Sequence, residues 1–266
     1  MSRVKGLHDL DFMLWNKIVK LYREDPITHA YLVYDLMYEL DKTEVYFVLD
    51  DDQVVGYVLI WAGLRRLGIH LWGNVKSLIE KIPFTEASVI QLYDASFLNS
   101  VITFLRGRSR AEVRYFVDMS VDENRFRPYR PEGAVRLRVG EDAHVRALMK
   151  IKRAQGRALD ECSIRELMER WRYYGVFKED ALVSIACAYL RLPEIWIIGD
   201  VFTHPEHRGR GYAKIVTSAI TRDAVVSGAR ALLHVRESNV PAIKVYKALG
   251  YEVLRKRPWI FMNEEV

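Results

Sequence analysis

The chain has 266 residues, of which 50% are hydrophobic and 28% are charged, a balance typical of globular and not of disordered proteins. No apolar run approaches the ~18 residues of a membrane-spanning helix, and the N-terminus lacks the apolar core of a secretory signal, so we expect a cytoplasmic protein without a membrane partner. The net charge of +5 is spread over 40 basic and 35 acidic residues, which argues against a nucleic-acid partner. Two cysteines without CxxC spacing and seven scattered histidines give no metal site. The low count of 3 Gln and 6 Asn favours a thermophilic source.

The first half of the chain is predicted to contain both helices and strands. Helices are expected at Phe12–Tyr22 and His29–Leu40, and strands at Val45–Leu49, Val54–Trp61 and Val113–Met119. The segment Phe126–Gly133 then contains two prolines and a glycine, which favours a domain boundary. We therefore expect one domain at residues 1–130 and a second at residues 131–266.

The second half shows clearer periodicity, and its elements alternate between the two types. Strands are expected at Val135–Val139, Gly175–Lys178, Leu182–Leu190, Glu194–Phe202, Leu232–Arg236 and Tyr251–Met262. Helices are expected at Glu141–Lys152, Ser163–Tyr173, Tyr212–Val226 and Pro241–Leu249, with Ser163 and Glu166 forming a capping box. The order βααβββαβαβ predicts an α/β fold with a mixed sheet.

The two halves show a faint internal similarity. An alignment at a spacing of about 143 residues matches the segment Val89–Ser96 with Leu232–Asn239. The helix expected after Val89–Ser96 and the strand Val113–Met119 then match the elements that follow Asn239. We therefore interpret the first half as a diverged α/β copy of the second.

The segment Arg208–Ala213, between a strand and a long helix, is the sharpest motif in the sequence. A helix N-terminus presents unpaired backbone N–H groups and partial positive charge, which suits an anion. Glycines at 209 and 211 allow close backbone approach to a phosphate, and the arginines at 208 and 210 add bidentate donors. Neither a P-loop nor a GxGxxG motif is present. The pattern predicts a diphosphate site, with a simple helix-capping turn as the alternative.

This segment resembles the signature of the GNAT superfamily of N-acetyltransferases, Arg/Gln-x-x-Gly-x-Gly/Ala, whose positions are filled by Arg208, Gly211 and Ala213. The approach through His204–His207 resembles the one usual in the superfamily, and the segment Val201–Ala213 is similar to the glycine N-acyltransferase-like branch. A second signature of the superfamily matches the residues Asn239, Ala242, Tyr246, Leu249, Gly250 and Tyr251. The resemblance covers about residues 134–262 and implies a GNAT-like fold there.

The resemblance implies acetyl-CoA as the acyl donor and gives roles to individual residues. The loop amides would bind the pyrophosphate, a strand backbone the pantetheine arm, and Tyr246 would protonate the departing thiolate. The implied acetyl-CoA-binding residues are Val201, Thr203, Arg208, Gly209, Arg210, Gly211, Tyr212, Ala213 and Asn239. A half-buried aromatic on an amphipathic helix is the simpler explanation of Tyr246.

The general base is not fixed by the sequence. Many relatives place a glutamate where this chain has Ile197, which cannot accept a proton. We consider Asp200 and His234 as substitutes for this glutamate. Two alternatives stay open: each side chain is simply ion-paired or solvated, or a water chain carries the amine proton to bulk solvent.

The first half lacks this machinery. Its counterpart of the loop, around His70–Asn74, has no Arg-x-x-Gly-x-Gly/Ala, and Thr103 and Ser96 stand 143 residues before Tyr246 and Asn239. We expect a degenerate GNAT-like domain that shapes the acceptor cleft.

The leading hypothesis is an N-acyltransferase that moves an acetyl or short acyl group from acetyl-CoA to a primary amine by direct attack in a ternary complex. The alternative is a non-catalytic acyl-CoA-binding or sensing module, which the isoleucine at 197 favours. A nucleic-acid binder, suggested by the basic run at 255–257, is less favoured. The acceptor is a small-molecule or peptide amine whose identity, like the acyl length and the oligomeric state, stays open.

Overall fold

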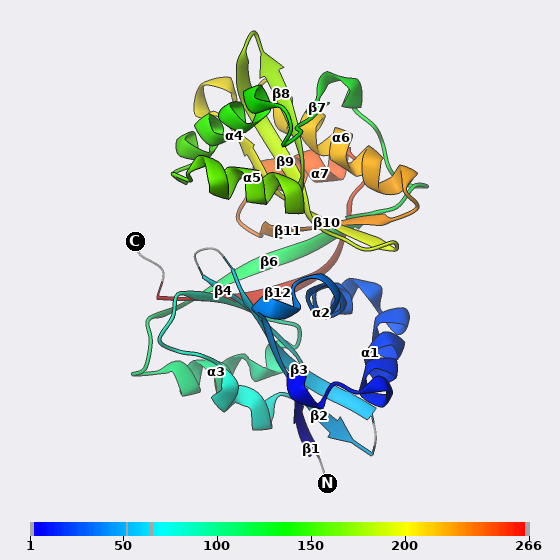
Figure 1. Ribbon diagram of the computed structural model, residues 1–266, viewed down its shortest axis with the longest axis vertical. Coiled ribbons are helices and arrows are strands. Elements are labelled where there is room, and N and C mark those ends of the chain that lie inside the picture. Colours follow the sequence, from blue (N-terminus) through cyan, green and yellow to red (C-terminus); the bar gives the residue numbers. More distant parts are fainter. Residues whose placement is uncertain (1–2, 52, 64–65, 264–266) are drawn as a thin grey trace. The chain divides into compact units, whose positions relative to one another are not determined.

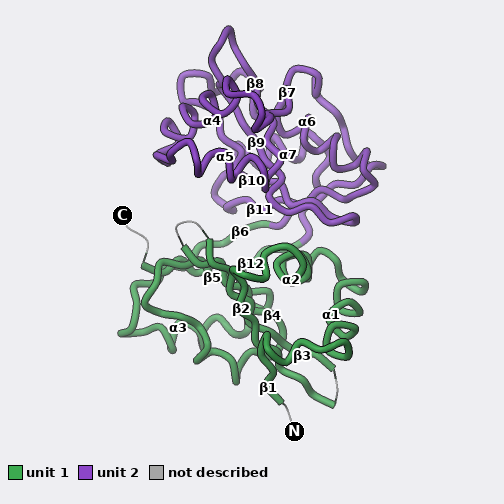
Figure 2. The backbone as a smooth tube through the Cα atoms, viewed as in Figure 1, with its two compact units in different colours: residues 1–117, 255–266 green, residues 118–254 purple. Residues whose placement is uncertain are grey.

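The computed structural model describes residues 3–51, 53–63 and 66–263, which form two compact units (Figures 1 and 2). Unit 1 contains residues 1–117 and 255–266, and unit 2 contains residues 118–254. The chain passes from unit 1 to unit 2 within strand β6 (Ala111–Val121) and returns within strand β12 (Glu252–Met262). The separate roles expected for residues 1–130 and 131–266 stay predictions.

Unit 1 is a mixed sheet with three helices. Besides β6 and β12, its strands are β1 (Arg3–Gly6), β2 (Thr43–Asp50), β3 (Gln53–Ala62), β4 (Leu67–Gly73) and β5 (Ser88–Leu92). Its helices are α1 (Phe12–Glu24), α2 (Pro26–Tyr38) and α3 (Leu98–Leu105), and a 3-10 segment, η3 (Lys76–Lys81), follows β4. The strand order is β1-β2-β3-β4-β5-β12-β6. Strands β4 and β5 pair in parallel, whereas β5 and β12 pair antiparallel.

Two aspartates set the limits of the first helices. Asp11 caps α1 by accepting a hydrogen bond from the backbone N–H of Leu14 at 2.7 Å. Asp25 ends α1 and caps α2 through the N–H of Thr28 at 3.1 Å. The second helix therefore begins at Pro26, a residue suited to a first helical position, and not at His29 as predicted.

Aromatic and imidazole rings fill part of the unit 1 core. The Trp72 ring lies 4.6 Å from that of His29 and 5.4 Å from that of Tyr57, and Tyr31 lies 4.2 Å from His70 between ring centroids. Burial lowers the pKa of His29 to about 4, so this side chain is neutral at physiological pH. Core packing thus accounts for these aromatic residues.

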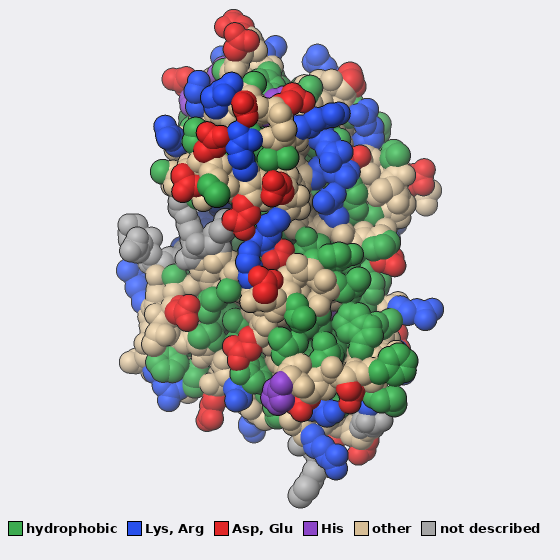
Figure 3. All heavy atoms as spheres, in the orientation of Figure 1, with side chains coloured by type: hydrophobic (Ala, Val, Ile, Leu, Met, Phe, Trp, Pro, Cys, Tyr) green, Lys and Arg blue, Asp and Glu red, His purple; other side chains and the backbone are tan. Residues whose placement is uncertain are grey.

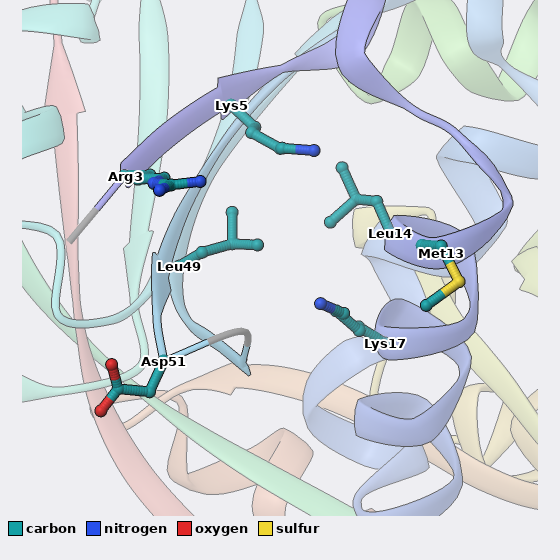
Figure 4. Close-up of a pocket in the computed structure, with 7 residues that line it drawn as sticks. All are labelled: Arg3, Lys5, Met13, Leu14, Lys17, Leu49 and Asp51. Carbon is teal, nitrogen blue, oxygen red and sulfur yellow. The ribbon is translucent and has the colours of Figure 1, made fainter. Parts of the chain in front are cut away.

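The surface of unit 1 combines apolar and cationic side chains. Large apolar residues are exposed at the start of α1 (Phe12, 75%) and at the end of α2 (Tyr38, 58%), and hydrophobic side chains gather on the visible face of this unit (Figure 3). A cavity of about 510 Å³ lies between β1, the end of β2 and α1 (Figure 4). Its lining residues are Arg3, Lys5, Met13, Leu14, Lys17, Leu49 and Asp51. None of them was predicted to bind acetyl-CoA.

Unit 2 contains the remaining elements. Its strands are β7 (Val135–Arg136), β8 (Arg172–Lys178), β9 (Ala181–Arg191), β10 (Ile195–Thr203) and β11 (Arg230–Arg236), and the order is β6-β11-β10-β9-β8-β7. Its helices are α4 (Asp142–Ala154), α5 (Glu161–Arg170), α6 (Tyr212–Val226) and α7 (Val240–Ala248). Strands β10 and β11 pair in parallel, whereas β10 and β9 pair antiparallel.

Strand β8 shows that helices cover both faces of the unit 2 sheet. Tyr173 is buried in a cluster with α4 and α5 residues such as Val145 and Ile164. Its two neighbours, Arg172 and Tyr174, both donate hydrogen bonds to the carboxylate of Asp223 on α6, at 2.6 and 3.2 Å. Since successive strand residues point to opposite faces, α6 lies on the face opposite to α4 and α5.

Some predicted boundaries in this half are wrong. Helix α5 begins at Glu161 and is capped by Asp160, whose side chain accepts from the Ser163 N–H at 2.7 Å, so the capping box expected from Ser163 and Glu166 does not form. The helix ends at Arg170 because the following Trp-Arg-Tyr-Tyr sequence favours a strand, which becomes β8. The first strand of this half is limited to residues 135–136.

The predicted order βααβββαβαβ is confirmed from β7 to β12. The first half repeats it, from β1 to β6, except that η3 stands where the second half has α6. The segment 70–74, interpreted from sequence as the counterpart of the loop, lies at the end of β4. No helix among the described residues is both long and apolar enough to cross a membrane.

Gly250 provides a test of this architecture. Its φ is +95°, and a Cβ there would lie 2.0 Å from the carbonyl oxygen of Arg125. We expect Gly250→Ala to lower the free energy of unfolding by at least about 2 kcal/mol. Urea denaturation measures this change.

The matched control is Gly140→Ala, because a Cβ added at Gly140 would have no heavy atom within 4 Å. This variant should change stability by less than about 0.5 kcal/mol. Equal effects of the two substitutions would contradict the packing around Gly250.

Candidate functional site

The loop after β10 delivers uncapped N–H groups at the start of α6. Gly209 and Gly211 adopt left-handed backbone conformations, with φ of 75° and 82°. Gly211 is the N-cap of α6 and provides no side-chain hydrogen bond, and the first turn of the helix holds no acidic residue. The N–H groups and the helix dipole at this end therefore suit an anion.

Strands β10 and β11 part just before this loop. Their parallel ladder pairs Ile195–Ile198 with Arg230–Leu233, although both strands continue beyond it. The register of β10 against β9 shifts between Gly199 and Phe202, which marks a β-bulge that bends the strand. The bend leaves the edge of β10 from Gly199 to Thr203 outside the ladder with β11, so an extended ligand could hydrogen-bond to it.

A groove of about 660 Å³, the α6 groove, lies along this edge. Its lining residues are Val201, Phe202, Thr203, His207, Arg208, Gly209, Gly211, Tyr212, Ala213, Lys214, Asn239, Pro241, Ala242, Val245 and Tyr246. Both sequence motifs therefore meet in one groove, which includes the glycines of the loop and the apolar α7 residues Pro241, Ala242 and Val245. Of the predicted cofactor residues only Arg210 is outside the lining, at an exposed position.

Tyr246 and Asn239 reach the α6 groove from α7. Tyr246 is 7% exposed, and burial raises the pKa of its phenol to about 12. The group is therefore protonated across the physiological range and can donate a proton. Asn239 caps α7 by accepting from the Ala242 N–H at 3.3 Å.

Asp200, a predicted base candidate, lies outside the lining of the α6 groove and is held by several donors. It forms an ion pair with Lys152 of α4, and the two side chains are 6% and 1% exposed. The Gln155 amide and the Tyr173 hydroxyl donate to its carboxylate at 2.8 and 2.9 Å, and Arg157 lies 3.3 Å away. These partners satisfy both carboxylate oxygens and hold the side chain in place, which makes Asp200 a structural anchor.

His234, the other candidate, also lies outside the lining of the α6 groove, and it pairs with a buried carboxylate. Its Nδ1 lies 2.7 Å from Oδ1 of Asp118 on β6, and the two side chains are 4% and 0% exposed. His234 directly follows Leu233, the last β11 residue in the ladder with β10. A carboxylate on Nδ1 fixes the orientation of the ring.

The described residues of unit 1 lack the long helix whose start borders the α6 groove in unit 2. The parallel strands β4 and β5 of unit 1 are followed by η3 and by η4 (Ala95–Phe97) with α3, so no long helix starts after β4. Ser96 lies in η4 and Thr103 in α3, and neither side chain can replace the amide or phenol of its counterpart. No group of three His, Cys, Asp or Glu residues that could hold a metal ion occurs within the described ranges.

Several residues of the site were not predicted from the sequence. Asp118 lies 116 positions from His234, and no local pattern links the two. Lys152 appears on a helix as an ordinary charge, and only tertiary contact reveals its pairing with Asp200. His207 and Lys214 flank the loop and could have been found from their position beside the motif.

Comparisons with known proteins agree with this fold. Residues 173–260 match the family model described as FR47-like protein. No curated protein matches the sequence.

Solved structures match over nearly the whole chain. A Drosophila protein has 14% identity and a TM-score of 0.73, covering 98% of this chain and 99% of its own. A GCN5-related N-acetyltransferase-like protein from Streptococcus suis has 13% identity and a TM-score of 0.64, with 94% and 99% covered. A tandem GNAT protein from the clavulanic acid biosynthesis pathway has 15% identity and a TM-score of 0.60, with 100% of both chains covered. The chain thus has the fold of tandem GNAT proteins, and the GNAT-like fold that the resemblance implied is confirmed.

The contacts of Asp200 predict a large effect on stability. Asp200→Asn leaves the buried ammonium of Lys152 without its charged partner, so we expect the free energy of unfolding to fall by about 3 kcal/mol. Urea denaturation at neutral pH measures this loss. Asp180→Asn, on the exposed turn between β8 and β9, is the control and should change stability little. A stable Asp200→Asn protein would show that the pair does not anchor β10.

Proposed function

We propose that this protein is an acyl-CoA-dependent N-acyltransferase that moves an acetyl or short acyl group to a primary amine. The observation that carries the proposal is that both motif regions, the loop 208–213 without Arg210 and the residues Asn239 and Tyr246 at α7, line one groove of about 660 Å³. The groove begins where β10 leaves β11 and ends at the uncapped start of α6.

The residues present fit acetyl-CoA along the length of the α6 groove. The amides from Gly209 to Ala213 would hold the pyrophosphate, with Arg208 adding charge at the loop. The backbone of Val201 and Thr203 would hydrogen-bond the pantetheine arm. The apolar surfaces of Pro241 and Val245 would exclude water beside it.

The reaction needs only acid–base assistance from the protein. Acetyl-CoA supplies a thioester whose acyl carbon bonds to the amine nitrogen while its carbon–sulfur bond breaks. Tyr246 would give its proton to the sulfur, and its raised pKa of about 12 keeps it protonated. Positioning of the two substrates supplies most of the remaining rate enhancement.

Between the two base candidates, the contacts favour His234. Asp200 is surrounded by cationic and hydroxyl donors, whereas the imidazole of His234 is oriented by the Asp118 carboxylate. In this proposal His234 takes the amine proton, directly or through water, and Asp118 is a positioning residue.

A non-catalytic acyl-CoA-binding module is the second candidate. The side chain at the superfamily's acidic position, Ile197, is fully buried in the core and leaves no carboxylate there. In that case the α6 groove binds the thioester without turnover. That the acceptor is a small-molecule or peptide amine is a further proposal. That the first domain shapes the acceptor cleft is another.

Calorimetric titration with acetyl-CoA tests the binding function. We expect micromolar affinity for the wild-type protein and a loss of about 10- to 100-fold in an Arg208→Ala, Arg210→Ala double variant, since both substitutions remove charge at the pyrophosphate. Absence of binding by the wild-type protein would refute both candidates.

Turnover separates the two candidates. Tyr246→Phe and His234→Gln should each lower kcat by about 100-fold while the Kd for acetyl-CoA is unchanged. Because the pKa of Tyr246 is about 12, ionisation of this acid should not reduce kcat below about pH 10. Release of free CoA thiol with a panel of amines measures the rates. A wild-type protein that binds acetyl-CoA yet releases no thiol with any amine would favour the binding module.

A further inference from the structure

A second groove, the α4 groove, lies beside the loop in unit 2 and has a volume of about 640 Å³. It is formed by α4, the turn between β8 and β9, and the residue that follows β10. Its lining residues are Ala143, Arg146, Ala147, Lys150, Ile151, Ala154, Lys178, Glu179, Asp180, Ala181, Leu182 and His204. None of them belongs to the predicted cofactor or catalytic residues.

The α4 groove carries cations that the fold does not use. Arg146, Lys150 and Lys178 line it and are exposed, and within the described part of the chain none of them forms an ion pair. The Lys178 ammonium lies 5.7 Å from the ring of Tyr212, and Arg146 interacts electrostatically with Asp142. The exposed carboxylates of Glu179 and Asp180 line the same groove. Side chains that are cationic and structurally uncommitted suit a mobile anionic ligand.

A row of side chains joins the α4 groove to the α6 groove. His204 lines the first, and His207 and Tyr212 line the second. The ring centroids of His204 and His207 are 5.9 Å apart, and those of His207 and Tyr212 are 6.4 Å apart. The Nδ1 atoms of His204 and His207 are buried, and neither makes a hydrogen bond within the described residues. A ligand held at the loop can therefore continue past these rings.

We propose that the α4 groove binds the 3′-phosphorylated adenosine end of CoA, with Lys178 and Arg146 contacting the 3′-phosphate. This inference rests on the proposed function, which puts the pyrophosphate at residues 208–213. A phosphomonoester carries close to two negative charges at neutral pH, and lysine and arginine are its usual partners. The methyl groups of Ala143, Ala147 and Ala154 on α4 offer an apolar surface for the base.

The 3′-phosphate gives the proposal a specific consequence, which is discrimination between CoA and 3′-dephospho-CoA. The two nucleotides share the pantetheine arm and the pyrophosphate and differ only in the group assigned to the α4 groove. The wild-type protein should bind CoA about tenfold more tightly than 3′-dephospho-CoA, as expected for one or two charge-assisted hydrogen bonds.

The experiment is calorimetric titration of the full-length protein with each nucleotide at constant ionic strength. An Arg146→Ala, Lys178→Ala double variant should bind CoA about tenfold more weakly and 3′-dephospho-CoA with unchanged affinity. Its matched control is an Arg153→Ala, Arg222→Ala double variant, which removes the same charge from exposed positions of α4 and α6 outside both grooves. This control should keep the wild-type preference for CoA.

Four outcomes would overturn the proposal. Equal affinity of the wild-type protein for the two nucleotides, or an equal loss for both in the groove variant, would show that the α4 groove does not receive the 3′-phosphate, while the proposed function would stand. Loss of the preference in an Arg210→Ala variant alone would put the phosphate at the loop instead. Absence of binding by either nucleotide to the wild-type protein would remove the proposed function together with this inference.

Discussion

The ion pair between Lys152 and Asp200 is the interaction on which the site of unit 2 depends. Asp200 has a φ of 53° and lies within the bulge of β10, a conformation that a non-glycine residue keeps only when its surroundings hold it. The buried ammonium of Lys152, the amide of Gln155 and the hydroxyl of Tyr173 supply that constraint. These three side chains hold the bend of β10 in place. Because of the bend, the ladder with β11 ends, the α6 groove opens and the chain continues into the loop before α6.

The two halves of the chain show how much one element contributes to such a site. Both follow the same order of strands and helices, and both contain a parallel pair of strands at the equivalent place. Only the second half has a long helix after the first strand of that pair, because the first half has η3 there. Without the start of a long helix there is no row of aligned N–H groups. The presence of η3 in place of a long helix thus accounts for the lack of a second loop of this kind among the described residues of the first half.

Charge in unit 2 falls into two classes with different consequences. Buried charges, such as those of Asp118 and Lys152, are paired and fix the positions of strands and of His234. Exposed cations around the loop and on α4 lack ion-pair partners within the described residues and remain available to a ligand. Some of the basic residues that give the sequence its positive net charge therefore lie in the two grooves, where the proposed anionic substrate, acetyl-CoA, would bind.

The sequence by itself determined the order of elements in the second half, the loop and the α7 residues that meet it. These depend on local rules, namely apolar periodicity, glycine conformation and helix ends, which act over a few residues. It did not determine where α5 ends, since helix and strand propensities compete at Trp171, nor which base candidate is usable. Asp200 and His234 look alike as polar residues on strands, and their partners are 48 and 116 positions away. Only the tertiary structure brought these partners together, because burial and long-range pairing decide the charge environment of a side chain and leave no local pattern in the sequence.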